Sequence, residues 1–295
     1  MSLLIAFLLN ATDYSQTAQT DGSEVSPDVA ARLQQQIASD SIEAKRAALF
    51  EIRNLRSAWA SRLAIPALRD KNLIVRASAA ASVVFAPKAE ASAALIPLLN
   101  DKDEFVRRES AYALGDVQDR SATAPLTRLL QDDKIIEVKT AAANALGKIG
   151  DVSAINALLT ILKTRPREDD EFLRRSAARS IGQIAQINIT GDATVLTPQN
   201  FLPEKFKDLG SSDPTVSIAE SFTSSVNVLT AVLQNKSESD DTRREAAYAL
   251  GAIGDKRSVP VLQAYLAGAD PYLAEICKEA LLKIERRNKV SDPSD

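Results

Sequence analysis

The feature that most constrains this chain is an internal repeat. A basic residue followed by a run of small and aliphatic residues returns at intervals of 31 to 35 residues, with one interval of 69. The repeated position holds Lys45, Arg76, Arg107, Lys139, Arg174 and Arg243, and a last partial copy has Cys277 there. A period in the low thirties is typical of solenoids, in which each unit buries its apolar face against its neighbours. The sequence therefore predicts a repeat array.

Each copy is predicted to be a pair of helices. In the second helix, apolar residues recur at three- and four-residue spacing, and a capping residue stands four positions before the basic one. The predicted N-caps are Ser41, Asn72, Asp103, Asp170 and Ser239, with Ile135 as the exception. The late positions of the helix hold Gly115, Gly147, Gly182 and Gly251. Pro66 and Pro97 lie inside the preceding helix, which they are expected to kink.

The repeat motif itself resembles a known family. Segments such as Val138-Lys-Thr-Ala-Ala-Ala-Asn-Ala-Leu-Gly147 and Thr242-Arg-Arg-Glu-Ala-Ala-Tyr-Ala-Leu-Gly251 resemble HEAT repeats of the short type named for phycobilisome lyases. The resemblance covers residues 40–287, and it is weaker in the first two copies, where Arg53 and Val84 replace the glycine. It implies an all-α, right-handed solenoid of about six to seven stacked helix-turn-helix repeats over residues 28–287.

One interval is too long for a single repeat and predicts an insertion. The extra residues carry no repeat signature and are expected to form a loop over residues 187–213, followed by a long first helix over 214–234. Phe201 and Phe206 are apolar residues placed between prolines of this loop. They would either fold back to cover the array or dock a partner.

The two ends of the chain differ from the array. Residues 1–27 are expected to be a flexible N-terminus or the remnant of a signal peptide, because the apolar run over residues 3–9 lacks a preceding positive charge. That run is too short to span a membrane. Residues 288–295 are expected to be a disordered tail. The expected location is therefore the cytoplasm, or the periplasm or exterior if residues 1–20 are a truncated signal.

Two residue counts exclude whole classes of chemistry. The chain has no histidine, which excludes His-ligated zinc, a Ser-His-Asp triad and an imidazole general base. The related repeats of deoxyhypusine hydroxylases hold iron through His and Glu, so that activity lacks its ligands here. The single cysteine, Cys277, permits no intramolecular disulfide and is expected to be buried. We expect no catalytic residue, metal or cofactor.

The repeated basic residues define a ladder along the array. In the family that the repeats resemble, such residues pair with acidic residues near the turn of an adjacent unit, and Asp101, Asp133 and Asp255 are available. A structural role is therefore expected, with a solvent-facing basic stripe as the alternative. The ladder residues considered are Arg76, Arg107, Lys139, Arg174 and Arg243.

Candidate partner-binding residues follow the ladder positions. The arrangement Arg-Glu-x-x-Tyr occurs twice, as Arg108-Glu109 with Tyr112 and as Arg244-Glu245 with Tyr248. Tyr and Arg are favoured at protein interfaces, although ordinary packing between repeats would also explain them. The full candidate set is Arg108, Glu109, Tyr112, Arg175, Arg179, Arg244, Glu245, Tyr248, Phe201 and Phe206.

These observations favour a non-catalytic scaffold that presents the concave face of a solenoid to a protein or peptide. The formal charge of −3 argues against nucleic acid as the partner. The alternative, implied by the resemblance, is a lyase-like chaperone subunit that binds a bilin-type chromophore and its acceptor protein. An enzyme that uses only carboxylates, Lys or Tyr is a third possibility, but no convergent pair of carboxylates marks it.

Overall fold

The chain is an all-α solenoid of stacked helix-turn-helix repeats. The computed structural model describes residues 27–191 and 222–290, and all regular structure within these ranges is helical. In chain order the elements are α1 (Pro27–Ala38), α2 (Ile42–Leu55), α3 (Ala58–Ala64), η1 (Ile65–Arg69), α4 (Leu73–Ser82), α5 (Lys88–Leu95), η2 (Ile96–Asn100), α6 (Glu104–Val117), η3 (Arg120–Ala122), α7 (Thr123–Asp132), α8 (Ile136–Ile149), η4 (Val152–Ala154), α9 (Ile155–Lys163), η5 (Glu168–Asp170), α10 (Glu171–Thr190), α11 (Thr223–Gln234), α12 (Asp240–Ile253), η9 (Lys256–Ser258), α13 (Val259–Gln263) and α14 (Pro271–Val290).

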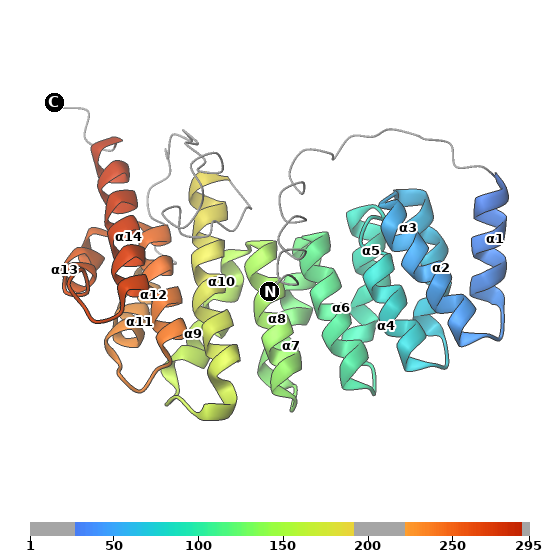
Figure 1. Ribbon diagram of the computed structural model, residues 1–295, viewed down its shortest axis with the longest axis horizontal. Helices are drawn as coiled ribbons and strands as arrows, with labels where there is room; N and C mark the ends of the chain where they lie inside the picture. Colours follow the sequence, from blue (N-terminus) through green and yellow to red (C-terminus); the bar gives the residue numbers. More distant parts are fainter. Residues whose placement is uncertain (1–26, 192–221, 291–295) are drawn as a thin grey trace, which may run out of the picture.

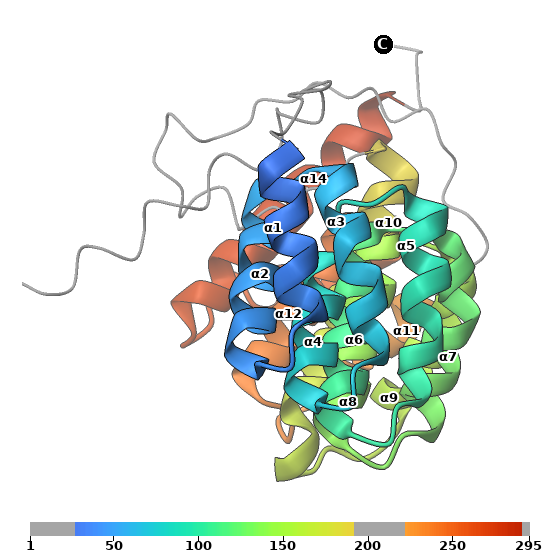
Figure 2. The ribbon, with the colours of Figure 1, turned by 90° about the vertical axis from the view of Figure 1, so that its right-hand side faces the viewer.

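The repeats stack side by side into a row (Figure 1). The second helices, which carry the ladder, are α2, α4, α6, α8, α10, α12 and α14, and each packs on the second helix of the next repeat. Seen along the row, α2, α4 and α6 form one layer and α3, α5 and α7 form the other (Figure 2). We call the surface of the layer that contains α2, α4 and α6 the second-helix face, because the second helix of every repeat lies in it.

Small residues let neighbouring second helices approach closely. The core of α8 is made of Ala141, Ala142, Ala143 and Ala145 with Leu146, all buried. A Cβ atom added to Gly115 would lie 2.8 Å from Cα of Ala145, and one added to Gly251 would lie 2.6 Å from Cα of Ala280. Gly115 and Gly251 are therefore required because the backbone of the next second helix touches them, whereas a Cβ on Gly147 would meet the side chains of Ser180 and Gln183.

The helix ends follow the predicted caps with one exception. The side chains of Ser41, Asn72, Asp103 and Ser239 accept hydrogen bonds from the first-turn N–H groups of α2, α4, α6 and α12. Asp170 stands at the start of α10 but does not cap it, because its carboxylate instead accepts a hydrogen bond from the backbone N–H of Arg167 at 3.1 Å.

The predicted kinks are changes of helix type. At Pro66 and Pro97 the α-helix gives way to a 3₁₀ helix that begins one residue earlier, at Ile65 and Ile96. Proline removes a backbone donor, so the first helices of these two repeats cannot continue as α-helix.

Two predicted boundaries need correction. α10 continues to Thr190, so residues 187–190 are helical where a loop was predicted. Residues 288–290, predicted as part of a disordered tail, belong to α14. Both helices are 20 residues long, whereas α6, α8 and α12 have 14. The periodic pattern ends before these extra turns. The predicted first helix over 214–234 is α11, which begins at Thr223, and residues 214–221 lie outside the described residues.

Cys277 lies on α14 and is fully buried. Burial raises the pKa of its thiol to about 12, with a smaller contribution from the carboxylate of Asp270. The thiol therefore stays protonated at neutral pH, and the side chain acts as a small apolar group of the core.

The contact at Gly251 gives a test of the stacking. Replacing a helical glycine with alanine ordinarily stabilises a helix by about 1 kcal/mol. Here the new methyl group would meet the backbone of Ala280, so we expect Gly251→Ala to destabilise the fold by about 1–3 kcal/mol. The measurement is urea unfolding followed by circular dichroism, and a rise in the midpoint would contradict the packing of α12 on α14.

Candidate functional site

The ladder residues tie the turns of adjacent repeats together. Nε of Arg76 lies 2.8 Å from a carboxylate oxygen of Asp101, and Nε of Arg107 lies 2.6 Å from one of Asp133. A second nitrogen of each guanidinium also donates to the same carboxylate. Each arginine additionally donates to a backbone carbonyl of its own turn, as Arg107 does to Asp101 at 2.9 Å. One side chain therefore joins two consecutive turns.

The acidic partners are fixed by the turns that they occupy. The carboxylate of Asp101 accepts the backbone N–H of Asp103 at 2.9 Å, and that of Asp133 accepts the N–H of Ile135 at 2.9 Å. Burial alone would raise the pKa of Asp101 and Asp133, but the hydrogen bonds from arginine and from the backbone outweigh it, so both pKa values lie below the ordinary value. Asp70 has the same arrangement with Lys45, whose Nζ lies 2.5 Å away.

Within residues 27–191 and 222–290, Lys139 and Arg243 form no such link between turns. Lys139 donates to the backbone carbonyl of Gln131, in its own turn, at 2.9 Å. Arg243 donates to the carbonyl of Leu233 and pairs with Asp240, three residues earlier, at 3.2 Å. Asp255, which the sequence offered as a ladder partner, instead pairs with Arg257 two residues away.

Arg174 makes the most buried ion pair of the ladder. Its guanidinium binds both carboxylate oxygens of Glu238, one of them through Nε at 2.9 Å, and the two side chains are only 1% and 2% exposed. Glu238 lies after the segment that separates α10 from α11. This pair therefore holds together two repeats that are far apart in the sequence.

A groove crosses the second-helix face over α6, α8 and α10. Its volume is about 570 Å³, and it contains five of the candidate residues that the sequence singled out. These are Arg108, Glu109 and Tyr112 from α6, and Arg175 and Arg179 from α10. Further lining includes Ile136, Asn144 and Phe172. We call this the central groove.

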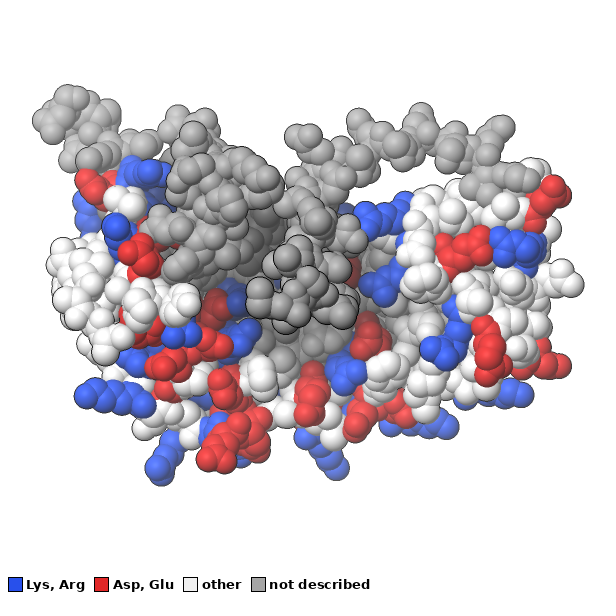
Figure 3. All heavy atoms as spheres, viewed as in Figure 1, with Lys and Arg blue, Asp and Glu red and all other residues white. Residues whose placement is uncertain are grey.

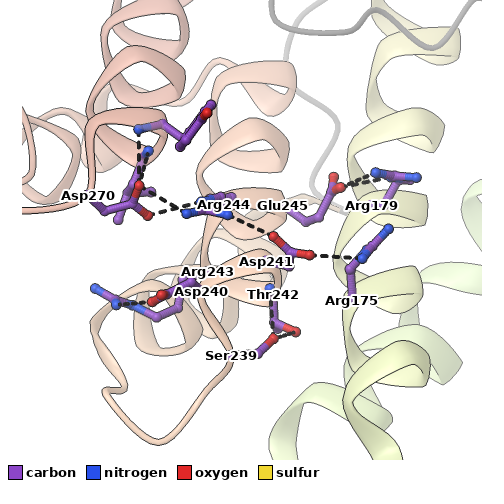
Figure 4. Close-up of polar contacts among 12 residues, drawn as sticks. Arg175, Arg179, Ser239, Asp240, Asp241, Thr242, Arg243, Arg244, Glu245 and Asp270 are labelled. Atoms are coloured by element: carbon purple, nitrogen blue, oxygen red, sulfur yellow. Dashed lines mark hydrogen bonds and ion pairs between the residues drawn. The ribbon is translucent and has the colours of Figure 1, made fainter. Parts of the chain in front are cut away.

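Beyond the central groove, ion pairs join α10 to α12 and α14 (Figure 4). Arg175 pairs with Asp241 at 2.9 Å, and Nε of Arg179 donates to Glu245 at 2.9 Å. Arg244 pairs with both Asp241 at 2.8 Å and Asp270 at 3.0 Å, and its guanidinium lies over the ring of Tyr272. The candidates Arg244 and Glu245 are thus members of a network that holds the repeats together.

Tyr248 is buried, whereas the sequence predicted an exposed side chain. It is only 9% exposed, and its hydroxyl group donates to Oε1 of Gln186 at 2.7 Å. A Cβ atom on Gly182 would lie 2.7 Å from the Tyr248 ring, so the ring occupies space that this glycine leaves open. Tyr112 remains half-buried in the central groove. Phe201 and Phe206 lie outside the described residues.

The sequence analysis missed the two most exposed phenylalanines of the described residues. Phe172 in the central groove and Phe50 on α2 are each 68% exposed. Phe50 stands five residues after Lys45, as Tyr112 does after Arg107, so the repeat register was the signal that could have found it. Together with Tyr112, these rings place apolar area on a face that is otherwise charged.

Acidic and basic side chains alternate on the face seen in Figure 3. Among the described residues, no group of three Cys, Asp or Glu side chains is placed to hold a metal ion. None of the helices in residues 27–191 and 222–290 is both long and apolar enough to cross a membrane.

Comparison with known proteins identifies the family. The model of the HEAT-repeat family matches residues 92–182 and 215–281, which is more than half of the chain. The chain therefore belongs to the HEAT-repeat family. No curated protein sequence gives a significant match.

Solved structures show the same fold. An engineered protein is 21% identical, with a TM-score of 0.52 over 88% of this chain and 68% of its own. The complex of CpcE and CpcF of phycocyanin lyase from Nostoc sp. PCC7120 is 20% identical over 93% of this chain and 97% of that one, with a TM-score of 0.48. A designed armadillo repeat protein in complex with the peptide (KR)4 is 15% identical over 86% and 98%, with a TM-score of 0.43.

Removing Glu238 tests the buried pair. Glu238→Ala leaves the Arg174 guanidinium buried without its carboxylate, so we expect a loss of about 3–5 kcal/mol in the free energy of unfolding. Asp241→Ala removes a partly exposed carboxylate from the neighbouring network and should cost less than about 1 kcal/mol. Urea unfolding measures both. Equal losses would show that the buried pair contributes no more than an exposed one.

The ladder carboxylates also predict a pH dependence. Because the folded-state pKa values of Asp70, Asp101 and Asp133 are lowered, their contribution to stability is complete above the unfolded pKa of about 4. It is lost as the pH falls through the lower folded values. The urea midpoint should therefore stay constant from about pH 7 to 5 and fall below about pH 4. Asp101→Asn should reduce this acid dependence, and an unchanged dependence would contradict the assignment.

Proposed function

We propose that this HEAT-repeat protein is a non-catalytic scaffold that binds a protein or peptide on its second-helix face, with the central groove as the docking site. The observation that carries the proposal is the lining of that groove. Tyr112 and Phe172 offer aromatic surface beside Arg108, and aromatic residues and arginine provide most of the binding energy at protein interfaces. Phe172 is 68% exposed, so a partner that covers it gains the burial of a large apolar side chain.

The surroundings of the groove favour binding without rearrangement. Arg175 and Arg179 are held by Asp241 and Glu245 of the next repeat, and the helices of the groove approach one another closely at Gly115 and Gly147. A rigid surface loses little conformational entropy when a partner binds. Arg175 and Arg179 therefore act as walls of the groove, while Tyr112, Phe172 and Arg108 are the groups that make new contacts.

Asn144 is suited to recognise the main chain of a bound peptide. It lies on α8, in the middle of the central groove, and its side-chain amide has no hydrogen-bond partner among the described residues. An amide offers both donors and an acceptor, which is the combination that an extended peptide bond requires. Its role would be to orient the ligand, whereas the aromatic residues would supply affinity.

Photo-crosslinking tests the location of the site. A benzoylphenylalanine introduced at position 144 should crosslink a protein or peptide partner in an extract of the source cells. The same group at position 128, an exposed position on α7 in the layer of first helices, should not crosslink it. Equal crosslinking from both positions would contradict a specific groove. A coloured small molecule that copurifies with the protein, without a protein partner, would favour the bilin-binding chaperone instead.

Substitutions in the central groove test whether its aromatic side chains supply the binding energy. We expect Tyr112→Ala combined with Phe172→Ala to weaken binding of the crosslinked partner at least thirtyfold, because two central aromatic contacts are removed. Arg128→Ala on α7 is the matched surface control and should change binding less than twofold. Isothermal titration gives the affinities, and circular dichroism verifies that the variants fold. Unchanged affinity in the double variant would exclude the central groove as the docking site.

A further inference from the structure

The arginines of the second-helix face fall into two groups. Arg175 and Arg179 on α10 pair with carboxylates of α12, and Arg244 on α12 pairs with Asp270, directly before α14. On α2, the exposed Arg46 and Arg53 form no ion pair and no side-chain hydrogen bond with any residue in the described part of the chain. A guanidinium that already forms hydrogen bonds with a carboxylate gains little binding free energy from a second anion. A guanidinium that is hydrogen-bonded only to water can exchange that water for a carboxylate.

The two unpaired arginines border a second groove. It lies between α2 and α4, has a volume of about 420 Å³, and includes Phe50. The spacing of Arg46, Phe50 and Arg53 at i, i+4 and i+7 places them on one side of α2. We call this the N-terminal groove.

The side of the N-terminal groove formed by α4 is shallow because its residues are small. They are Ser78, Ala81 and Ser82. Phe50 is therefore left 68% exposed beside a surface that an apolar side chain can fill. Burying both apolar groups together is favourable by about 25 cal/mol per Å² of apolar area removed from water.

The charged side chains of the N-terminal groove favour an acidic ligand. Arg46 and Arg53 lie on either side of Phe50, and Glu43 is the one acidic residue of the lining. The local balance is therefore positive, although the formal charge of the chain is −3. Arginine forms bidentate hydrogen bonds with carboxylates, and clusters of arginine recognise acidic motifs.

We propose that the N-terminal groove binds an acidic segment of the partner protein, in which an apolar side chain that packs on Phe50 is flanked by carboxylates that pair with Arg46 and Arg53. This assignment rests on the proposed function, since it gives the chemistry of one part of a partner held on the second-helix face. The central groove supplies the other contact, because its arginines on α10 are already paired and its free surface is aromatic.

The test uses a defined probe. A fluorescently labelled decapeptide with one Phe flanked on each side by two Glu residues should bind the full chain with a dissociation constant below 1 mM. It should bind at least tenfold more tightly than the same peptide with Lys in place of Glu. Fluorescence anisotropy measures both. Affinity should fall as salt is raised from 50 to 500 mM, since partly exposed charge pairs are screened.

Substitutions then assign the contacts. Arg46→Gln with Arg53→Gln should weaken peptide binding at least tenfold, and Phe50→Ala at least fivefold. Arg69→Gln with Arg128→Gln removes two exposed arginines outside both grooves and should change binding less than twofold. All three variants alter exposed side chains, and circular dichroism verifies their folding. Equal binding by the wild-type chain and the Arg46/Arg53 variant would overturn the proposal.

Two further outcomes separate this inference from the proposed function. If Tyr112→Ala with Phe172→Ala releases the partner while the Arg46/Arg53 variant retains it fully, the central groove stands and the acidic-segment assignment fails. A benzoylphenylalanine at position 50 identifies the occupant directly. A crosslink to residues 1–26 of the same chain, which contain Asp13, Asp21 and Glu24 and no Lys or Arg, would overturn the assignment to a partner.

Discussion

The solenoid depends on a basic side chain that reaches from one turn to the next. Arg76 and Arg107 each bind a carbonyl of the turn that begins their own helix and the carboxylate of the following turn. The carboxylate is in turn held by a backbone N–H of its own loop. The stacking distance and the conformation of the turns are thus set by the same group of atoms. Apolar packing of the helices supplies the driving force, and these links specify the register in which the helices stack.

The repeat period made much of this arrangement predictable. The family resemblance implied that the basic residues pair with acidic residues near the turn of an adjacent unit, and Arg76 with Asp101 and Arg107 with Asp133 do so across 25 and 26 residues. Glu238 could not be found in this way, because a stretch of sequence without the repeat pattern separates it from Arg174 and no period connects the two. The extra turns of α10 and α14 were missed for a similar reason, since the motif describes only the part of a helix that every repeat shares.

The candidate binding residues were harder to predict because exposure depends on the neighbouring repeat. Tyr112 and Tyr248 occupy equivalent positions, yet only Tyr248 is buried, since Gly182 of the preceding second helix leaves room for its ring. Phe50 has the same position in its repeat as both tyrosines and is exposed beside small residues of α4. A motif gives the direction in which a side chain leaves its helix. The residues on the neighbouring second helix decide whether that side chain reaches solvent.

The missing link at Lys139 gives the array a mechanical seam. Among the residues that the structure describes, Lys139 bonds only to its own turn, so the turns that precede α8 and α10 are not joined as those of the earlier repeats are. Contacts between the helices themselves remain, including the bond from Ser180 to the carbonyl of Ala143 at 2.8 Å. When the row of repeats is bent, separation at this edge breaks fewer charge-assisted bonds than elsewhere. The central groove crosses this seam, so its width there is held by the contacts between α8 and α10 and not by a charged link between turns.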